Sequence, residues 1–372
     1  MPEFCITNIV DACNFFSRGL PDIYFRNFDL IKNLTNFALI YSSKTDIIYN
    51  QHLRNKIFDI LLSNFYLDAN EKNKNLLFSH QKLLKESFIK ENLIFSIMLV
   101  FIDAERLGTS THFFERFSVR DDVLYLVNEA FKKNKDIFKE NIINYANIHS
   151  EDASQMISLL LGDVSYLSDE VIQRLIAIKK YQDLKDDKEK WNSKNYEERK
   201  REDDIFNENN QWLKVECRLL NHFLSFMTLI CSCLQKYFIK EKKAERFATL
   251  LNCCLNQFTS KSSQLNIKNR KDYDFKPSFI IESLITIYSY FTNYEEFIEI
   301  IIKKESSFKY DNFLKAIKVK DSYYKVKVDF NISEIFDDLV YYKIKKAKEN
   351  IEKMQLIMMM RLKNFKTLFY MY

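Results

Sequence analysis

Only three glycines and three prolines occur in this chain of 372 residues, and their scarcity limits the folds open to it. Average usage would give roughly 26 glycines and roughly 19 prolines at this length. The hairpins of sheet-rich folds need residues with positive φ, and phosphate-binding loops need glycines where the backbone meets phosphate. The sequence therefore favours helices and excludes Rossmann and P-loop sites.

Apolar residues recur at the spacing of an amphipathic helix through most of the chain. Residues 47–61 and 93–101 are two such stretches, and no repeat with shared identities is visible between them or elsewhere. A long helical chain must bury one face of each helix against its neighbours, and stacked helix pairs do this over any length. We therefore predict an all-α fold, an irregular armadillo-like helical solenoid.

Changes in composition divide the sequence into four parts. Residues 179–210 alternate in charge, which predicts a charged linker or an exposed helix. Residues 339–372 carry eight Lys or Arg against two Glu and predict a basic amphipathic tail. Residues 1–178 and 211–338 are predicted to be the N-terminal and C-terminal halves of one helical core. A short polar stretch at 68–74 predicts a loop.

The charge balance and the cysteine pattern bear on partners and compartment. A net charge of +5 from 56 basic and 51 acidic residues gives a mixed surface, which does not indicate a nucleic-acid binder. The longest uncharged stretch, 219–234, is shorter than the roughly 20 apolar residues of a spanning helix, so we predict a buried helix and no membrane span. Seven cysteines without framework spacing, and an N-terminus without a signal pattern, predict the cytoplasm and nucleus.

No group of residues has the spacing that catalysis or metal binding needs. Cys231 and Cys233 lie two apart on a predicted helix and so point to different sides, and the pair at 253–254 also lacks the usual two-residue spacer. Cys217 and His222 are more simply core neighbours than a nucleophile and its base. The five histidines form no metal-binding pattern. We therefore expect no catalytic residue, cofactor or metal.

Two glycine-containing segments predict junctions between helices. Gly108 fits the left-handed cap after the apolar helix that ends near residue 102, and the Thr and Ser residues after it can cap the next helix. By the same reasoning Gly162 and Asp163 are predicted to interrupt one helix before another starts, with Asp163 as a local cap.

Several motifs in these regions, in a fixed order, resemble the ubiquitin elongating factor core family. Met1 to Phe4 is similar to an internal family motif, and residues 50–54 resemble Asn-Pro-Tyr/His-Leu-Arg, with Gln51 in place of the proline. The most specific match is the family's D-x-E-x-x-G motif and the F-x-x-(K/R)-F-x-x-R motif that follows it. Its positions here are Asp103, Glu105, Gly108, Phe114, Phe117 and Arg120.

The resemblance continues to about residue 300. Residues 160–170 look like N-x-L-x-N-D-x-(T/S)-(Y/F)-L-x-D-E, with Ser158 and Gly162 in place of the asparagines. Residues 246–256 are similar to R-L-A-A-M-L-N-x-x-L, followed by residues 259–261 in place of Gly-Pro-Lys, and residues 269–277 to N-P-E-K-Y-x-F-x-P-K. The matching positions are Asp163, Tyr166, Leu167, Glu170, Asn252, Tyr273, Phe275 and Pro277, and we interpret all the motif positions mainly as helix-junction and packing residues.

The resemblance implies an armadillo-like solenoid, usually preceded by several hundred residues and followed by a U-box. In the family the U-box docks a ubiquitin-conjugating enzyme loaded with ubiquitin and forms no covalent intermediate of its own. Family members also bind a hexameric segregase ATPase, proteasome shuttle factors and ubiquitylated substrates. The U-box signature contains prolines, and none follows Pro277. We therefore expect a chain without the U-box, through a shortened gene model or a real truncation.

Two functions remain open from the sequence. The first is the core of a ubiquitin-protein transferase (a chain elongation factor of the U-box ligase family) in proteasomal degradation, inactive in transfer when alone. The second is a non-catalytic scaffold that binds the segregase ATPase, shuttle factors or substrates. The basic tail at 339–372 is either the helix that connects to the U-box or a segment that binds an anionic membrane or a calmodulin-like partner.

Overall fold

The computed structural model describes residues 3–65, 79, 81–107, 113–133, 135–260, 265–304, 307–322, 330–350 and 352–354. All regular secondary structure in these ranges is helical, which confirms the predicted all-α class. The chain forms two compact units, Met1–Leu160 with Ser225–Leu234, and Leu161–Leu224 with Gln235–Tyr372. The four segments drawn from composition stay a prediction. The predicted loop at 68–74 lies outside the described residues.

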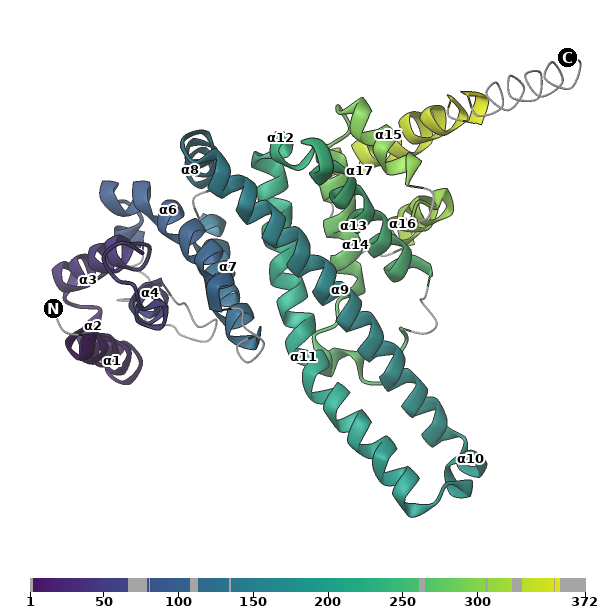
Figure 1. The fold of residues 1–372 in the computed structure, drawn as a ribbon, viewed down its shortest axis with the longest axis horizontal. Coiled ribbons are helices and arrows are strands. Elements are labelled where there is room, and N and C mark those ends of the chain that lie inside the picture. Colours follow the sequence, from purple (N-terminus) through teal and green to yellow (C-terminus); the bar gives the residue numbers. More distant parts are fainter. Residues whose placement is uncertain are drawn as a thin grey trace, which may run out of the picture. The chain divides into compact units, whose positions relative to one another are not determined.

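The first unit is built from short helices that pack on near neighbours in the chain. α1 packs on α4, α3 on α4 and α6, and α7 on α4, α6 and α8, the stacking expected of a helical solenoid. Figure 1 shows these helices in purple and blue. Their bounds are α1 Glu3–Gly19, α2 Pro21–Tyr24, α3 Phe28–Tyr41, α4 Gln51–Phe65, α6 Ser87–Asp103, the 3-10 turn η1 Ala104–Leu107, α7 Phe113–Lys133 and α8 Lys135–Ile148.

The second unit is centred on α13, which packs on α14, α15 and α16, while α14 also packs on α16 and α17. Aromatic rings fill this core, where Phe247 stacks on Phe297 with ring centroids 5.4 Å apart. The bounds are α12 Gln235–Phe238, α13 Glu241–Ser260, η2 Arg270–Tyr273, α14 Pro277–Tyr290, α15 Glu295–Lys303, α16 Tyr310–Ser322, α17 Phe330–Asp338 and the π-helical turn η3 Leu339–Ile344.

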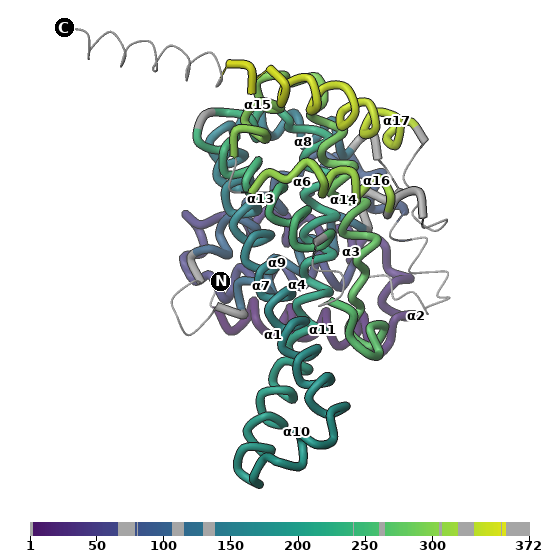
Figure 2. Tube along the Cα trace, turned by 90° about the vertical axis from the view of Figure 1, so that its right-hand side faces the viewer, coloured from purple at the N-terminus to yellow at the C-terminus, as the bar shows by residue number. Residues whose placement is uncertain are grey.

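Two long helices, α9 (Ser150–Asp186) and α11 (Tyr196–Cys233), contribute residues to both units. In the second unit they run side by side as a hairpin, joined through α10 (Lys188–Ser193), as Figure 1 and Figure 2 both show. The charged segment 179–210 forms this end of the hairpin. It is closed by the stacked rings of Tyr181 and Phe206, 4.2 Å apart, and by Lys185 over the ring of Trp191.

Polar caps fix where several helices begin. Asn195 accepts from the backbone N–H of Glu198 at 2.9 Å, and the Glu198 carboxylate accepts from the N–H of Asn195 at 3.0 Å, a capping box at the start of α11. Asn27 caps α3 in the same position. Pro21 and Pro277 occupy the first helical position of α2 and α14, where a missing N–H has no consequence.

The prediction that Gly162 and Asp163 interrupt a helix is wrong. α9 runs without a break from Ser150 to Asp186. A single glycine inside a helix costs only about 1 kcal/mol relative to alanine, and the buried residues on either side, Leu160, Leu161 and Val164, keep the helix packed. Asp163 is therefore a buried residue within α9 and not a cap.

None of the described helices combines the length and the apolar character that a membrane-spanning segment requires. Residues 219–233 lie in α11, and Phe223, Phe226 and Ile230 are fully buried there.

Candidate functional site

In the first unit, the most specific family motif converges on the buried side chain of Arg120. This residue comes from α7 and is fully buried, and its Nε donates to the carbonyl of Phe101 at 3.2 Å. Its Nη2 donates to Oε2 of Glu105 at 2.8 Å, and the guanidinium lies over the ring of Phe101, 4.8 Å from its centroid. Arg120 therefore joins α7 to the end of α6 by a charge-assisted bond, a backbone bond and a cation–π contact.

A second arginine joins α4 to the same end of α6. Arg54 is buried and makes an ion pair with Asp103, and its Nη1 donates to the carbonyls of Ile48 and Tyr49. The side chain of Gln51 donates to the backbone carbonyl of Asp103. The residue that replaces the family's proline thus gives α4 a further hydrogen bond to α6.

Two positions of this motif are only partly described. Gly108 lies outside the described residues, so its predicted role as a helix cap stays a prediction. Phe114 belongs to α7, but its side chain is outside the description, whereas Phe117 is buried.

In the second unit, Asn252 is the hub of a buried hydrogen-bond network. From α13 it donates to the carbonyl of Ile301 at 2.9 Å and accepts from the hydroxyl of Tyr288 at 3.0 Å. These bonds join α13 to α15 and α14. Every polar atom in such a network must be satisfied because the core excludes water.

The motif at 269–277 forms a tight turn that leads into α14. Asn269 and Asp274 both have left-handed backbones, with φ of 55° and 53°. Tyr273 is buried and donates to Oδ1 of Asn210 at 2.5 Å, and Phe275 is buried. Asn and Asp tolerate this conformation better than other residues that carry a side chain, so the turn does not need glycine.

The motif positions on α9 divide between the core and the surface. Leu167 and Asp163 are buried. Glu170 makes an ion pair with Arg174 at 3.3 Å, and Arg174 also pairs with Glu216 of α11 at 2.6 Å. Tyr166 is 36% exposed and lines a groove.

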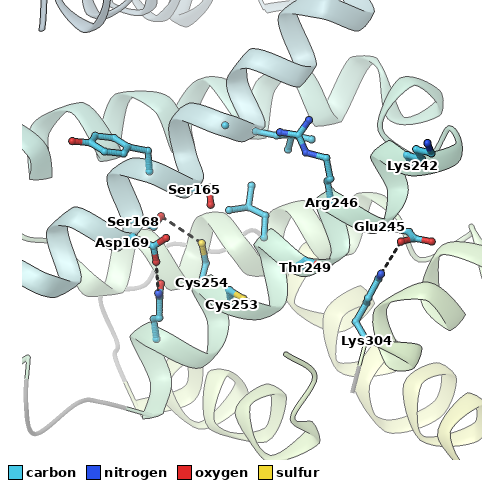
Figure 3. Close-up of a pocket in the computed structure, with 15 residues that line it drawn as sticks. Ser165, Ser168, Asp169, Lys242, Glu245, Arg246, Thr249, Cys253, Cys254 and Lys304 are labelled. Atoms are coloured by element: carbon cyan, nitrogen blue, oxygen red, sulfur yellow. Dashed lines mark hydrogen bonds and ion pairs between the residues drawn. The ribbon is translucent and has the colours of Figure 1, made fainter. Parts of the chain in front are cut away.

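This groove, with a volume of about 910 Å³, lies between α9 and α13, and we refer to it as the α9–α13 groove. Figure 3 shows the side chains that line it. They are Leu161, Gly162, Ser165, Tyr166, Ser168 and Asp169 of α9, Lys242, Glu245, Arg246, Thr249, Leu250, Cys253, Cys254 and Gln257 of α13, and Lys304 at the end of α15.

The groove has the character of a binding surface rather than a catalytic centre. Burial raises the pKa of Cys254 to about 12, and it also raises the pKa of Cys253, so neither thiol is ionised near neutral pH. The Cys254 thiol donates to the hydroxyl of Ser168 at 3.4 Å. The ranges described hold no group of three or more His, Cys, Asp or Glu side chains placed to hold a metal ion.

Two features of these sites were not predicted from the sequence. Arg54 and Asp103 lie in separate motifs, and no local pattern indicates that the two residues pair. Lys242 and Arg246 were not predicted to be a pair of exposed cations, although their spacing of four residues places both on one face of α13.

The comparisons with known proteins agree on one family. The family described as "Ubiquitin elongating factor core" matches residues 1–340. "Ubiquitin conjugation factor E4 A" of Pongo abelii is 25% identical over 332 residues, which cover 86% of this chain and 31% of the relative. "E4 ubiquitin-protein ligase UFD2" of Saccharomyces cerevisiae is 21% identical over 322 residues, covering 86% of this chain and 33% of the relative.

This chain thus spans about a third of the length of these relatives. The family match extends over most of the described helices and includes both the arginine junctions and the α9–α13 groove. The chain belongs to the ubiquitin elongating factor core family.

Proposed function

We propose that this chain is the helical scaffold of a ubiquitin-chain elongation factor, which orients already ubiquitylated substrates and their partner proteins while ubiquitin chains grow. The observation that carries the proposal is the family match over residues 1–340. The curated relatives are named as conjugation factors and as a ubiquitin-protein ligase, which supports a role in ubiquitin conjugation.

The chemistry of the described residues favours positioning over covalent catalysis. Burial raises the pKa of Cys217 and Cys231, in addition to the thiols of the groove, so these cysteines are poor nucleophiles for a ubiquitin thioester. A scaffold instead accelerates transfer by raising the effective concentration of the reacting partners. If the chain acts as such a scaffold, the conjugating enzyme binds only when a U-box is present elsewhere.

The segregase ATPase and the proteasome shuttle factors are the partners we propose, on the resemblance stated above. All seven cysteines are free thiols, which supports a reducing compartment, and we propose the cytoplasm and nucleus. The second candidate is a scaffold that binds these partners but takes no part in the growth of ubiquitin chains. The same helical surface supports this candidate.

Two measurements on the purified chain test the proposal. The first is capture of a tetraubiquitylated substrate and of the segregase ATPase on the immobilised chain. The second is the rate at which ubiquitin discharges from a loaded conjugating enzyme. We expect capture of both proteins and an unchanged discharge rate. Accelerated discharge by the chain alone would contradict the scaffold, and failure to capture either protein would contradict the proposed partners.

A further inference from the structure

The α9 wall of the α9–α13 groove includes three small residues, Gly162, Ser165 and Ser168. A Cβ added at Gly162 would meet no atom within 4 Å, so the groove is vacant at this point of α9. Ser165 follows one turn later on the same wall and is exposed. A volume of about 910 Å³ is within the range of about 300–1,000 Å³ found for ligand sites. The groove is large enough for several side chains of a bound segment.

The acidic side chains of the groove are already engaged. Asp169 accepts from the amide of Gln257 at 2.7 Å, and Glu245 makes an ion pair with Lys304 at 2.7 Å. Figure 3 shows both contacts as dashed lines. Lys304 also lowers the pKa of Glu245 by its hydrogen bond and its charge. The charge of Glu245 is therefore balanced by Lys304, whereas Asp169 is held by a neutral amide and keeps its negative charge near Gln257, away from Lys242 and Arg246.

Two cations of the groove are not balanced in this way. Lys242 and Arg246 lie four residues apart on the exposed face of α13, and neither makes an ion pair within the described residues. Burial lowers the pKa of the neighbouring Lys243, and the charges of Lys240 and Arg246 lower it further. Cations crowd this end of α13, so the groove has a positive end that favours an anionic group.

The opposite end of the groove contains an unsatisfied acceptor. The Oε1 atom of Gln257 is buried and has no hydrogen-bond partner in the described structure. A buried carbonyl oxygen without a partner costs free energy, and a bound donor recovers it when the Gln257 side chain turns this oxygen into the groove. Backbone N–H groups of an extended segment are such donors, whereas those of a helix interior are already paired.

We propose that the α9–α13 groove binds an extended acidic peptide segment of a partner protein. Carboxylates of the segment pair with Lys242 and Arg246, and one of its backbone N–H groups donates to Oε1 of Gln257. Bidentate carboxylate binding by arginine provides orientation as well as affinity. This docking site adds a specific binding chemistry to the scaffold role, and it can be tested independently of the ubiquitin-related function.

The probe is a library of fluorescein-labelled twelve-residue peptides in which each position is fixed in turn, bound to the purified chain of 372 residues. We expect Asp or Glu to be selected at two or more positions. Affinity of the selected peptide should fall at least tenfold in Arg246→Glu and in Gly162→Phe, whose ring occupies the vacant space on α9.

Matched variants separate loss of the groove from loss of the fold. Gly162→Ala adds only a methyl group, and Lys214→Glu makes the same reversal of sign at an exposed site elsewhere in the second unit, so both should keep their affinity. All four variants should retain the helical circular dichroism of the parent chain.

Three results would overturn the proposal. The first is a library that selects no acidic position. The second is an acidic peptide whose affinity survives both Arg246→Glu and Gly162→Phe. The third is binding of a labelled single-stranded RNA or of anionic vesicles, lost in Arg246→Glu, without selection of acidic peptides. That third result would assign the cations to a different anion.

Discussion

The arginines of the first unit and the arginine of the groove in the second unit have opposite environments. Arg54 and Arg120 are buried, and every contact described for them is made within the unit, with carboxylates, carbonyls and a ring. Arg246 is exposed and lines a groove. Both kinds lie in motifs that resemble the same family, so a motif match alone does not separate a packing residue from one that faces a partner.

Burial provides the distinction that the motif lacks. A guanidinium enclosed by its own unit contributes to folding, because removing it leaves a cavity and unpaired acceptors. A guanidinium on an exposed helix face contributes little to stability and is available for binding. The buried arginines of the first unit therefore stabilise the fold, whereas Arg246 is the arginine that we propose for binding a partner.

The largest expected effect comes from truncating the enclosed arginine. Arg120→Ala should lower the free energy of unfolding by about 3 kcal/mol, because a large buried side chain and its bonds to Phe101 and Glu105 are lost. Arg246→Ala is the matched control and should change it by less than about 0.5 kcal/mol. Urea unfolding followed by circular dichroism measures both, and equal losses in the two variants would contradict the distinction between buried and exposed arginines.

A smaller loss is expected in the core of the second unit. Asn252→Ala should cost about 2 kcal/mol, because the carbonyl of Ile301 and the hydroxyl of Tyr288 lose their buried partner. Tyr288→Phe removes one of these bonds and should cost about 1 kcal/mol. Chemical denaturation of the two variants measures these losses and distinguishes the motif residues that stabilise the core of this unit from those that line the groove. If Asn252→Ala leaves the free energy of unfolding unchanged, Asn252 is not among the residues that stabilise this core.

Replacing one half-buried carboxyl group in the first unit should stabilise the protein. Burial raises the pKa of Asp59 from 3.8 to about 6, although the charges of Arg18 and Lys56 oppose the shift. Since the folded state holds this proton more tightly, its contribution to stability is complete below about pH 4 and is lost as pH rises through 6.

Asp59→Asn should therefore raise the free energy of unfolding by about 1–2 kcal/mol at pH 7, a range that allows for partial solvent screening. The gain should disappear near pH 4. Unfolding curves at the two pH values test it, and a gain that is the same at both would show that charge burial is not its cause.

The smallest effect is expected at the groove. Gly162→Ala should raise the free energy of unfolding by about 0.5–1 kcal/mol, because alanine favours the helix and its Cβ enters open space. Differential scanning calorimetry would detect this as a small rise in melting temperature. A lower melting temperature would mean that the groove is closed at Gly162. The groove would then be less clearly different from the enclosed sites of Arg54 and Arg120.

The helical class follows from local sequence. Few glycines and prolines, together with helical apolar spacing, predicted the all-α class. Gly162 misled the same reasoning, because packing on both sides of a glycine overrides its low helix propensity.

Contacts between distant residues were beyond the reach of local patterns. Arg54 and Asp103 are separated by 49 residues, and the hydrogen bond between Asp169 and Gln257 spans 88 residues. The groove lies between α9 and α13, which are far apart in the sequence, so local patterns did not predict it. Likewise, the exposure of Arg246 and the burial of Arg120 cannot be read from two motifs that each contain an arginine.

The scaffold claim is tested most directly by competition in a reconstituted chain-growth reaction. In this reaction a full-length relative from the same family extends ubiquitin chains on a pre-ubiquitylated substrate. The 372-residue protein is then added in increasing excess, with no additional conjugating enzyme. We predict that the ubiquitin chains become shorter as the added protein occupies the substrate and the partner proteins. Longer ubiquitin chains when the 372-residue protein replaces the relative, or no change at saturating excess, would contradict the scaffold role.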